Sequence, residues 1–239
     1  MTPFFIIGFI GFIGIFIFSL WAQWRVKSNF GRYSEVAASS GVTGAQAARR
    51  IMDAAGIVGV EIVETESYLG DHYDPSKKVL CLSTAVFNTP SVAALGIAAH
   101  ECGHAIQDKL GYAPLKARAV VVPVAVVASK VLPFVMIFGG FLFGGFGRHG
   151  HGMWAIQLGF WCYLVLTVFQ LITLPVEFDA TRRAKIILGE MQLIQPGEEA
   201  RGVNKVLDSA ALTYVAAFAA TLFHLIRFWL MLQGGRNRD

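Results

Sequence analysis

Four long apolar stretches alternate with polar segments along this chain. The first covers residues 4–23 without a charged side chain, and the others cover about 119–146, 153–175 and 209–231. A helix of about 20 apolar residues spans the roughly 30 Å hydrocarbon core of a bilayer. The pattern therefore predicts four transmembrane helices, and the short polar turn at 148–151 predicts that the middle two form an antiparallel hairpin.

The first apolar stretch has two interpretations: a membrane anchor that is retained, or a signal peptide that is cleaved. No basic residue precedes the stretch, the run is long, and Arg25 and Lys27 follow it. A signal peptide has a basic region before its apolar core, and that core is shorter. A retained anchor over residues 1–23 is therefore the favoured interpretation.

Lysine and arginine are distributed unevenly over the polar segments. Segments 24–118 and 176–208 together hold fifteen of them, whereas the 147–152 turn and the C-terminal tail hold three. Cytoplasmic loops of membrane proteins are enriched in these residues. We therefore expect both longer segments in the cytoplasm, and we expect residues 209–239 to form the last span and a tail.

The longer polar segment contains signals for two helices. Thr43, followed three residues later by Gln46, matches a capping box and predicts a helix over 44–55. Pro90 suits the first turn of a helix, and the alanine-rich run after it predicts a second helix over 91–107. The segment is therefore expected to be a small folded domain.

A short β-hairpin is predicted between these helices. Residues 58–63 and 79–82 are β-branched or alternating runs on either side of the turn-rich segment 70–75. The edge near 78–82 either pairs with an extended peptide or only closes the domain. The predicted fold class is mainly α: a four-span integral membrane protein with a small cytoplasmic α+β domain, while segment 176–208 is expected to be helical.

Composition and charge narrow the class of protein. The chain is 55% hydrophobic with a mean hydropathy of +0.55, which is more apolar than one soluble core requires. The net charge is only +4 and the basic residues are dispersed, so no nucleic acid partner is expected. The three cysteines are too scattered for a disulfide framework.

The helix predicted over 91–107 carries the pattern His-Glu-x-x-His. Its residues are His100, Glu101 and His104. A spacing of four residues brings both imidazoles to one helix face, where they can bind one Zn²⁺, and Glu101 can then take a proton from zinc-bound water. This arrangement predicts a zincin-like catalytic domain. The alternative is a chance match in which the histidines are merely buried or capping.

A catalytic zinc needs a third protein ligand and one open position. Glu177 is the strongest candidate, because the predicted hairpin leaves and re-enters one side of the membrane. Asp179 is the rival ligand. In the alternative without a metal, both carboxylates pair with Arg182 and Arg183 at a helix start.

The chain resembles the bacterial YugP-type membrane zinc metallopeptidases, which are related in plan to the larger HtpX group of integral-membrane proteases. The matching stretches extend across most of the chain. They are Asp71-His72-Tyr73-Asp74-Pro75, residues 98–107 around the histidine motif, Gly111-Tyr112-Ala113-Pro114-Leu115-Lys116, Leu174-Pro175-Val176-Glu177-Phe178-Asp179-Ala180 and residues 210–217.

The resemblance implies roles for several of these residues. Glu177 matches the glutamate of the broader group's Glu-x-x-Ala-Asp motif, which supports it as a metal ligand. Thr181 stands where that motif has aspartate, so a carboxylate on a ligand histidine is either absent or supplied by Asp179. On chemical grounds alone, and not from the resemblance, the oxyanion could be stabilised by a hydrogen bond from His72 or Tyr214 or by the charge of Arg182, although each is more often a structural residue.

These features predict a zinc-dependent membrane endopeptidase with one Zn²⁺ in the bacterial inner membrane. The resemblance suggests polypeptide substrates, membrane proteins among them, and a role in quality control. The alternative is a noncatalytic membrane scaffold with a structural zinc. The sequence specifies neither the cleavage site nor the oligomeric state.

Overall fold

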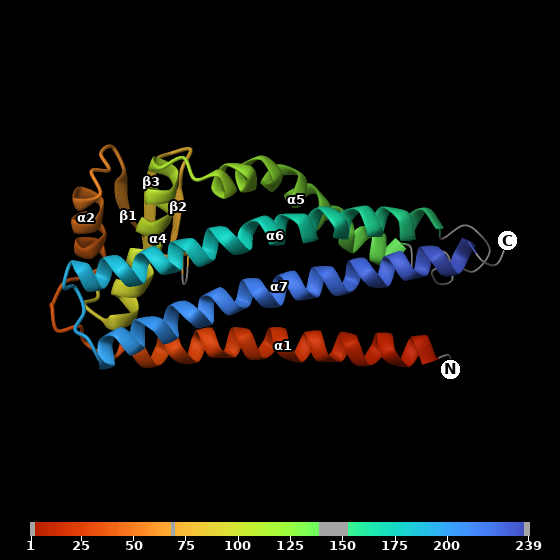
Figure 1. Ribbon diagram of the computed structural model, residues 1–239, viewed down its shortest axis with the longest axis horizontal. Coiled ribbons are helices and arrows are strands. Elements are labelled where there is room, and N and C mark those ends of the chain that lie inside the picture. The colour runs from red at the N-terminus through yellow and green to blue at the C-terminus, as the bar shows by residue number, and fades with distance from the viewer. Residues whose placement is uncertain (1–2, 68–69, 139–152, 237–239) are drawn as a thin grey trace. The chain divides into compact units, whose positions relative to one another are not determined.

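The computed structural model describes residues 3–67, 70–138 and 153–236 (Figure 1). Within these ranges the chain is mainly helical and contains one sheet of three strands. The elements in chain order are α1 Pro3–Ser34, α2 Gly44–Ala54, β1 Glu61–Thr65, β2 His72–Asp74, β3 Val79–Ser83, α3 Thr84–Phe87, α4 Val92–Lys109, α5 Ala113–Ile137, α6 Met153–Glu190 and α7 Glu198–Arg236.

Four helices of the described chain, α1, α5, α6 and α7, are long and apolar enough to cross a membrane. This confirms the four candidate spans. All four helices extend into what the sequence presents as polar segments: α1 continues to Ser34, α5 begins at Ala113, α6 continues to Glu190, and α7 begins at Glu198. The predicted end of the second span and the 147–152 turn lie outside the described residues.

Pro175 lies inside α6 and does not end that helix. A proline removes one hydrogen bond of the helical ladder, because it has no N–H. The helix after it is stabilised by buried side chains, among them Ala180, Ala184 and Leu188. Glu177 therefore lies on a helix rather than on a loop.

The chain divides into two compact units. The first comprises Met1–Leu20, Ala117–Thr173 and Tyr214–Asp239. Its small buried cluster contains Ile156, Tyr163 and Phe228, whereas large apolar side chains such as Phe9 and Phe16 are exposed. Exposure of many large apolar side chains on long helices is typical of a surface that faces lipid.

The second unit, Trp21–Lys116 with Leu174–Thr213, contains the sheet. The strand order is β1-β3-β2, with β1 parallel and β2 antiparallel to β3. The prediction that residues 58–63 and 79–82 form a hairpin is therefore wrong, because those segments pair in parallel. The hairpin is instead β2–β3, and its connection is held by Asp74, whose Oδ1 accepts hydrogen bonds from the backbone N–H groups of Ser76 and Lys77.

β3 is the central strand of this sheet, so the predicted free edge near 78–82 is also wrong. The register pairs Val79 to Ser83 with β1, and Val79 to Cys81 with β2. The segment 70–75, which is predicted as a turn, contains β2 itself. The two edges of the sheet are therefore β1 and β2.

The helix predictions in this unit are largely confirmed. Both hydrogen bonds of the capping box at Thr43 and Gln46 are present at the start of α2. The start of α4 differs by one position, because Ser91 is the N-cap, with its Oγ accepting from the Ala94 N–H, and Pro90 precedes it. The N-cap hydroxyl satisfies a backbone donor, which proline could not do.

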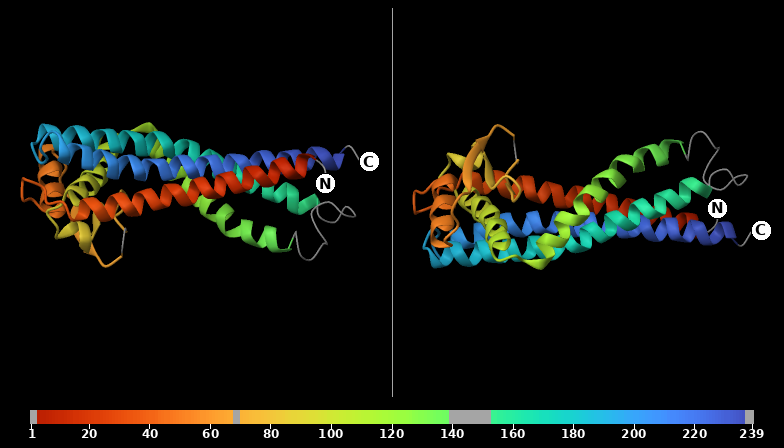
Figure 2. Two further views of the ribbon diagram at one scale, coloured as in Figure 1. Left: turned by 90° about the horizontal axis from the view of Figure 1, so that it is seen from below. Right: turned by 90° about the horizontal axis from the view of Figure 1, so that it is seen from above.

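The core of the second unit surrounds α4. This helix packs against α2 and against strands β2 and β3 (Figure 2). Its buried side chains, such as Leu95, join a cluster with Met52 of α2, Leu82 of β3 and Leu188 of α6. Packing on several sides fixes the rotation of α4 and thereby the directions of its polar side chains.

Candidate metal centre

α4 places His100 and His104 one helical turn apart on the same face. Their ring centroids are 4.8 Å apart and the rings are nearly perpendicular, at 88°. Both side chains are largely buried, with 13% and 11% of their surface exposed. Cys102 lies between them in sequence but faces α2, where its Sγ is 3.7 Å from the Ala48 carbonyl oxygen.

Gly103 brings α6 against this part of α4. A Cβ atom at position 103 would lie 2.9 Å from the Ala180 carbonyl oxygen and 3.1 Å from the Ala180 Cα. Both distances are too short for ordinary contact, so only glycine permits the observed approach of the two backbones. Glu177 lies three residues before Ala180 and therefore on the same face of α6.

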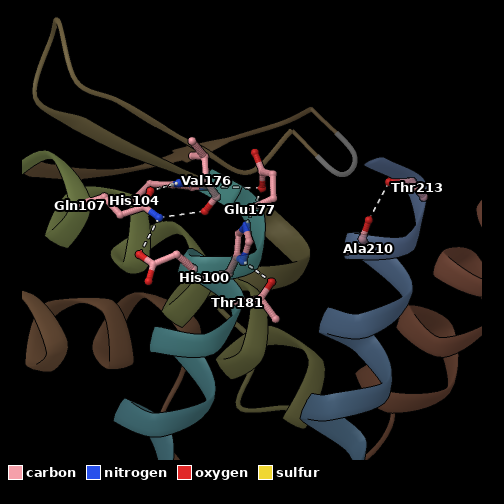
Figure 3. Close-up of polar contacts among 9 residues, drawn as sticks. His100, His104, Gln107, Val176, Glu177, Thr181, Ala210 and Thr213 are labelled. Carbon is pink, nitrogen blue, oxygen red and sulfur yellow. Dashed lines mark hydrogen bonds and ion pairs between the residues drawn. The ribbon is translucent and has the colours of Figure 1, made fainter. Parts of the chain in front are cut away.

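The Glu177 carboxylate reaches both imidazoles (Figure 3). Its Oε2 is 3.2 Å from the His100 Nε2 and 3.5 Å from the His104 Nε2, and the three candidate ligand atoms all lie within 4.8 Å of one another. Two atoms that bind a tetrahedral zinc at roughly 2.0–2.1 Å lie about 3.4 Å apart. The spacing and chemistry of these side chains therefore fit one zinc ion.

The electrostatics of the site favour a cation. Glu177 is only 1% exposed. Burial of the His104 imidazole opposes its charged form, but Glu177 and Glu101 outweigh this effect, so the pKa of His104 is raised. The negative potential that holds a proton on this ring equally stabilises a metal ion at the position between the three side chains.

Thr181 contacts the other nitrogen of His100. Its Oγ1 lies 3.3 Å from the His100 Nδ1. A hydroxyl, rather than a carboxylate, therefore lies against this nitrogen. No hydrogen bond joins Asp179 to either histidine among the described residues.

Asp179 instead binds three donors away from the cluster. Its carboxylate accepts hydrogen bonds from Arg182, Arg183 and the Gln107 amide. The described residues that converge as candidate ligands are therefore His100, His104 and Glu177, and the rival Asp179 is not among them.

The other predicted site residues are placed as follows. Glu101 is buried on α4, at 8% exposure, and none of the described hydrogen bonds or ion pairs engages its carboxylate. His72 is exposed on β2, with its Nδ1 2.8 Å from the Gly70 carbonyl oxygen. Arg182 pairs with Asp179, and Tyr214 belongs to the other compact unit. Roles for these four side chains remain predictions.

Two further residues, Gly103 and Gln107, belong to this site although no role is predicted for them from the sequence. Gly103 lies inside the histidine motif, where a small residue signals close helix packing. Gln107 is fully buried, and its Oε1 lies 3.0 Å from the His104 Nδ1. Its position three residues after His104, on the same helix face, is a signal that could have identified it.

Substitution of Gly103 by alanine is expected to weaken zinc binding and to slow any zinc-dependent reaction by up to about 100-fold, because the added Cβ displaces the α6 backbone that carries Glu177. Overpacking of this kind also costs about 1–3 kcal/mol of folding free energy. Zinc affinity from chelator competition and thermal unfolding measure the two effects.

Gly96→Ala on the same helix is the matched control. A Cβ at position 96 would meet its nearest neighbour, a Val203 side-chain carbon, at 3.7 Å, an ordinary contact. This variant should bind zinc normally. Equal zinc affinity in the two variants would contradict the importance of the Gly103 approach.

Known proteins resemble this chain over almost its whole length. The profile of a family described as "Putative neutral zinc metallopeptidase" matches residues 8–233. The chain is 45% identical over 221 residues to the "Putative membrane protease YugP" of Bacillus subtilis (strain 168), covering 92% of this chain and 94% of that protein. No solved structure gives a significant match. The resemblance noted in the sequence is confirmed.

Proposed function

Because this chain belongs to the family described as "Putative neutral zinc metallopeptidase", we propose that it is a zinc-dependent membrane endopeptidase. In this proposal His100, His104 and Glu177 hold one Zn²⁺, and Glu101 is the general base. The observation that carries the proposal is the convergence of two imidazoles and one buried carboxylate at spacings that suit a tetrahedral zinc.

The chemistry follows from the donor set. Bound at these three side chains, zinc would act as a Lewis acid that polarises the substrate carbonyl and lowers the pKa of a water molecule. Glu101 directly follows the candidate ligand His100 in the sequence, and its negative charge helps to raise the pKa of His104. Its carboxylate takes a proton from the attacking water and delivers it to the nitrogen of the leaving amine. No covalent acyl-enzyme forms.

The setting supports substrates at or in the membrane. Four helices are suited to crossing a bilayer, and the similar Bacillus protein is named as a membrane protease.

We assign the zincin-like unit to the cytoplasmic side of a bacterial inner membrane, from the excess of lysine and arginine in its segments. Labelling of single cysteines from outside intact cells tests this orientation. Cleavage of membrane proteins in quality control is the corresponding cellular role.

The competing function is a noncatalytic scaffold with a structural zinc. Structural zinc sites are usually closed by four protein ligands, whereas a catalytic site has three and leaves one position for water. The described His-His-Glu group has three. The donor count therefore favours the catalytic proposal.

Removal of the metal from the purified full-length protein in lipid nanodiscs is expected to abolish cleavage of an unfolded polypeptide, and added Zn²⁺ should restore it. The protein should remain folded, because a large apolar core surrounds α4 independently of the metal. Mass spectrometry of the products and circular dichroism measure the two outcomes. Zinc binding without cleavage of any polypeptide tested would favour the scaffold.

A further inference from the structure

The Gln107 side chain is held in one orientation by its partners. Its Nε2 donates to the Val176 carbonyl oxygen at 2.8 Å and to the Asp179 Oδ2 at 3.0 Å. A backbone carbonyl and a carboxylate only accept hydrogen bonds, so the NH₂ group of the amide must face them. The amide oxygen must then face His104, whose Nδ1 is 3.0 Å away.

This orientation determines the tautomer of His104. The Gln107 oxygen can only accept, so the His104 Nδ1 must carry the proton that it accepts. A neutral imidazole protonated on Nδ1 has its lone pair on Nε2. The His104 Nε2 is the atom 3.5 Å from Glu177, so the lone pair is directed at the position between the candidate ligands.

Asp179 secures the arrangement from the other side. Arg182 and Arg183 both donate to its carboxylate, which keeps that group an acceptor and prevents the Gln107 amide from turning over. His100 lacks an equivalent constraint, because the Thr181 hydroxyl at its Nδ1 either donates or accepts. The constraint on tautomer is thus specific to His104.

We propose that Gln107 is a positioning residue that fixes the His104 tautomer for zinc and ties the α6 backbone, at the residue before Glu177, to α4. The inference rests on the proposed zinc site. Gln107 is completely buried. Its three hydrogen bonds connect His104 on α4 with Val176 and Asp179 on α6. Its amide oxygen accepts the hydrogen bond that a carboxylate often accepts from a metal-bound histidine.

Gln107→Met tests this role, because methionine has a similar volume and forms none of these hydrogen bonds. Zinc affinity of the full-length protein, measured by chelator competition, is expected to fall by about 10–100-fold. In the zinc-loaded protein labelled with ¹⁵N-histidine, the His104 Nδ1–H resonance should be downfield and slow to exchange in the wild type. In the methionine variant it should move upfield and exchange quickly.

Gln107→Glu separates positioning from simple support of the helices. The glutamate retains an acceptor for the His104 Nδ1–H but cannot donate to the Val176 carbonyl or to Asp179. It is therefore expected to keep the His104 Nδ1–H resonance downfield and slow to exchange, whatever zinc affinity it loses with the contacts to α6. If this resonance exchanged as quickly with glutamate as with methionine, the inference would be wrong.

Failure of this inference is distinguishable from failure of the proposed function. A wild-type protein that binds no zinc would overturn both. A wild-type protein that binds zinc, together with a folded methionine variant of equal affinity and unchanged His104 resonance, would overturn only the role of Gln107.

Discussion

Replacement of Glu101 by glutamine is expected to slow peptide hydrolysis by about 10²–10⁴-fold while zinc remains bound. Glutamine has the same shape as glutamate but cannot take a proton from the attacking water. The three candidate ligands are unchanged, and no described hydrogen bond or ion pair depends on the Glu101 carboxylate. The expected result is therefore a loss of turnover without a loss of metal.

Cleavage rate and zinc content, measured on the same purified sample, provide the test. Glu190→Gln is a suitable control, because Glu190 is exposed at the end of α6, and it should leave both quantities unchanged. A Glu101→Gln protein that binds zinc and cleaves at the wild-type rate would exclude Glu101 as the general base.

Replacement of Glu177 by alanine is expected to lower zinc affinity by more than about 100-fold. Loss of a residue that only hydrogen-bonds to a ligand lowers the affinity by roughly 10–100-fold, and Glu177 is proposed to bind the metal itself. Glu177 is the only carboxylate in the described ligand group, and its burial makes its charge effective. Cleavage should disappear at limiting zinc. Chelator competition and metal analysis of the purified variant measure the loss.

Asp179→Ala discriminates between the two carboxylates that the sequence left as rivals. Asp179 contacts Gln107 and two arginines rather than the histidines, so its removal should weaken zinc binding much less than removal of Glu177. Loss of zinc with Asp179→Ala and retention with Glu177→Ala would reverse the assignment.

Local patterns in the sequence predicted the features that depend on neighbouring residues. Apolar runs identified four candidate spans, the Thr43 and Gln46 pair identified the start of α2, and the histidine spacing placed two side chains on one face of α4. Each of these signals reflects a physical requirement within one element, such as a capped helix end or a helix long enough to cross lipid.

Features that depend on pairing between distant segments were harder to predict. β1 pairs with β3 in parallel because the chain between them forms β2, which pairs with the other edge of β3. The alternation of apolar and polar residues within a strand does not show whether that strand pairs in parallel or antiparallel. Likewise, glycine within the histidine motif gave no sign that its partner would be the backbone of Ala180. The Gln107 contacts to α6 follow from that same packing.

X-ray absorption at the zinc edge, on the full-length protein loaded with one equivalent of Zn²⁺, tests the proposed centre most directly. We expect a zinc ion bound only by nitrogen and oxygen at roughly 2.0–2.1 Å, with the outer scattering of two imidazoles. That scattering should fall to one imidazole in His104→Ala. A sulfur ligand at roughly 2.3 Å, or an unchanged spectrum in His104→Ala, would show that zinc binds elsewhere in the chain.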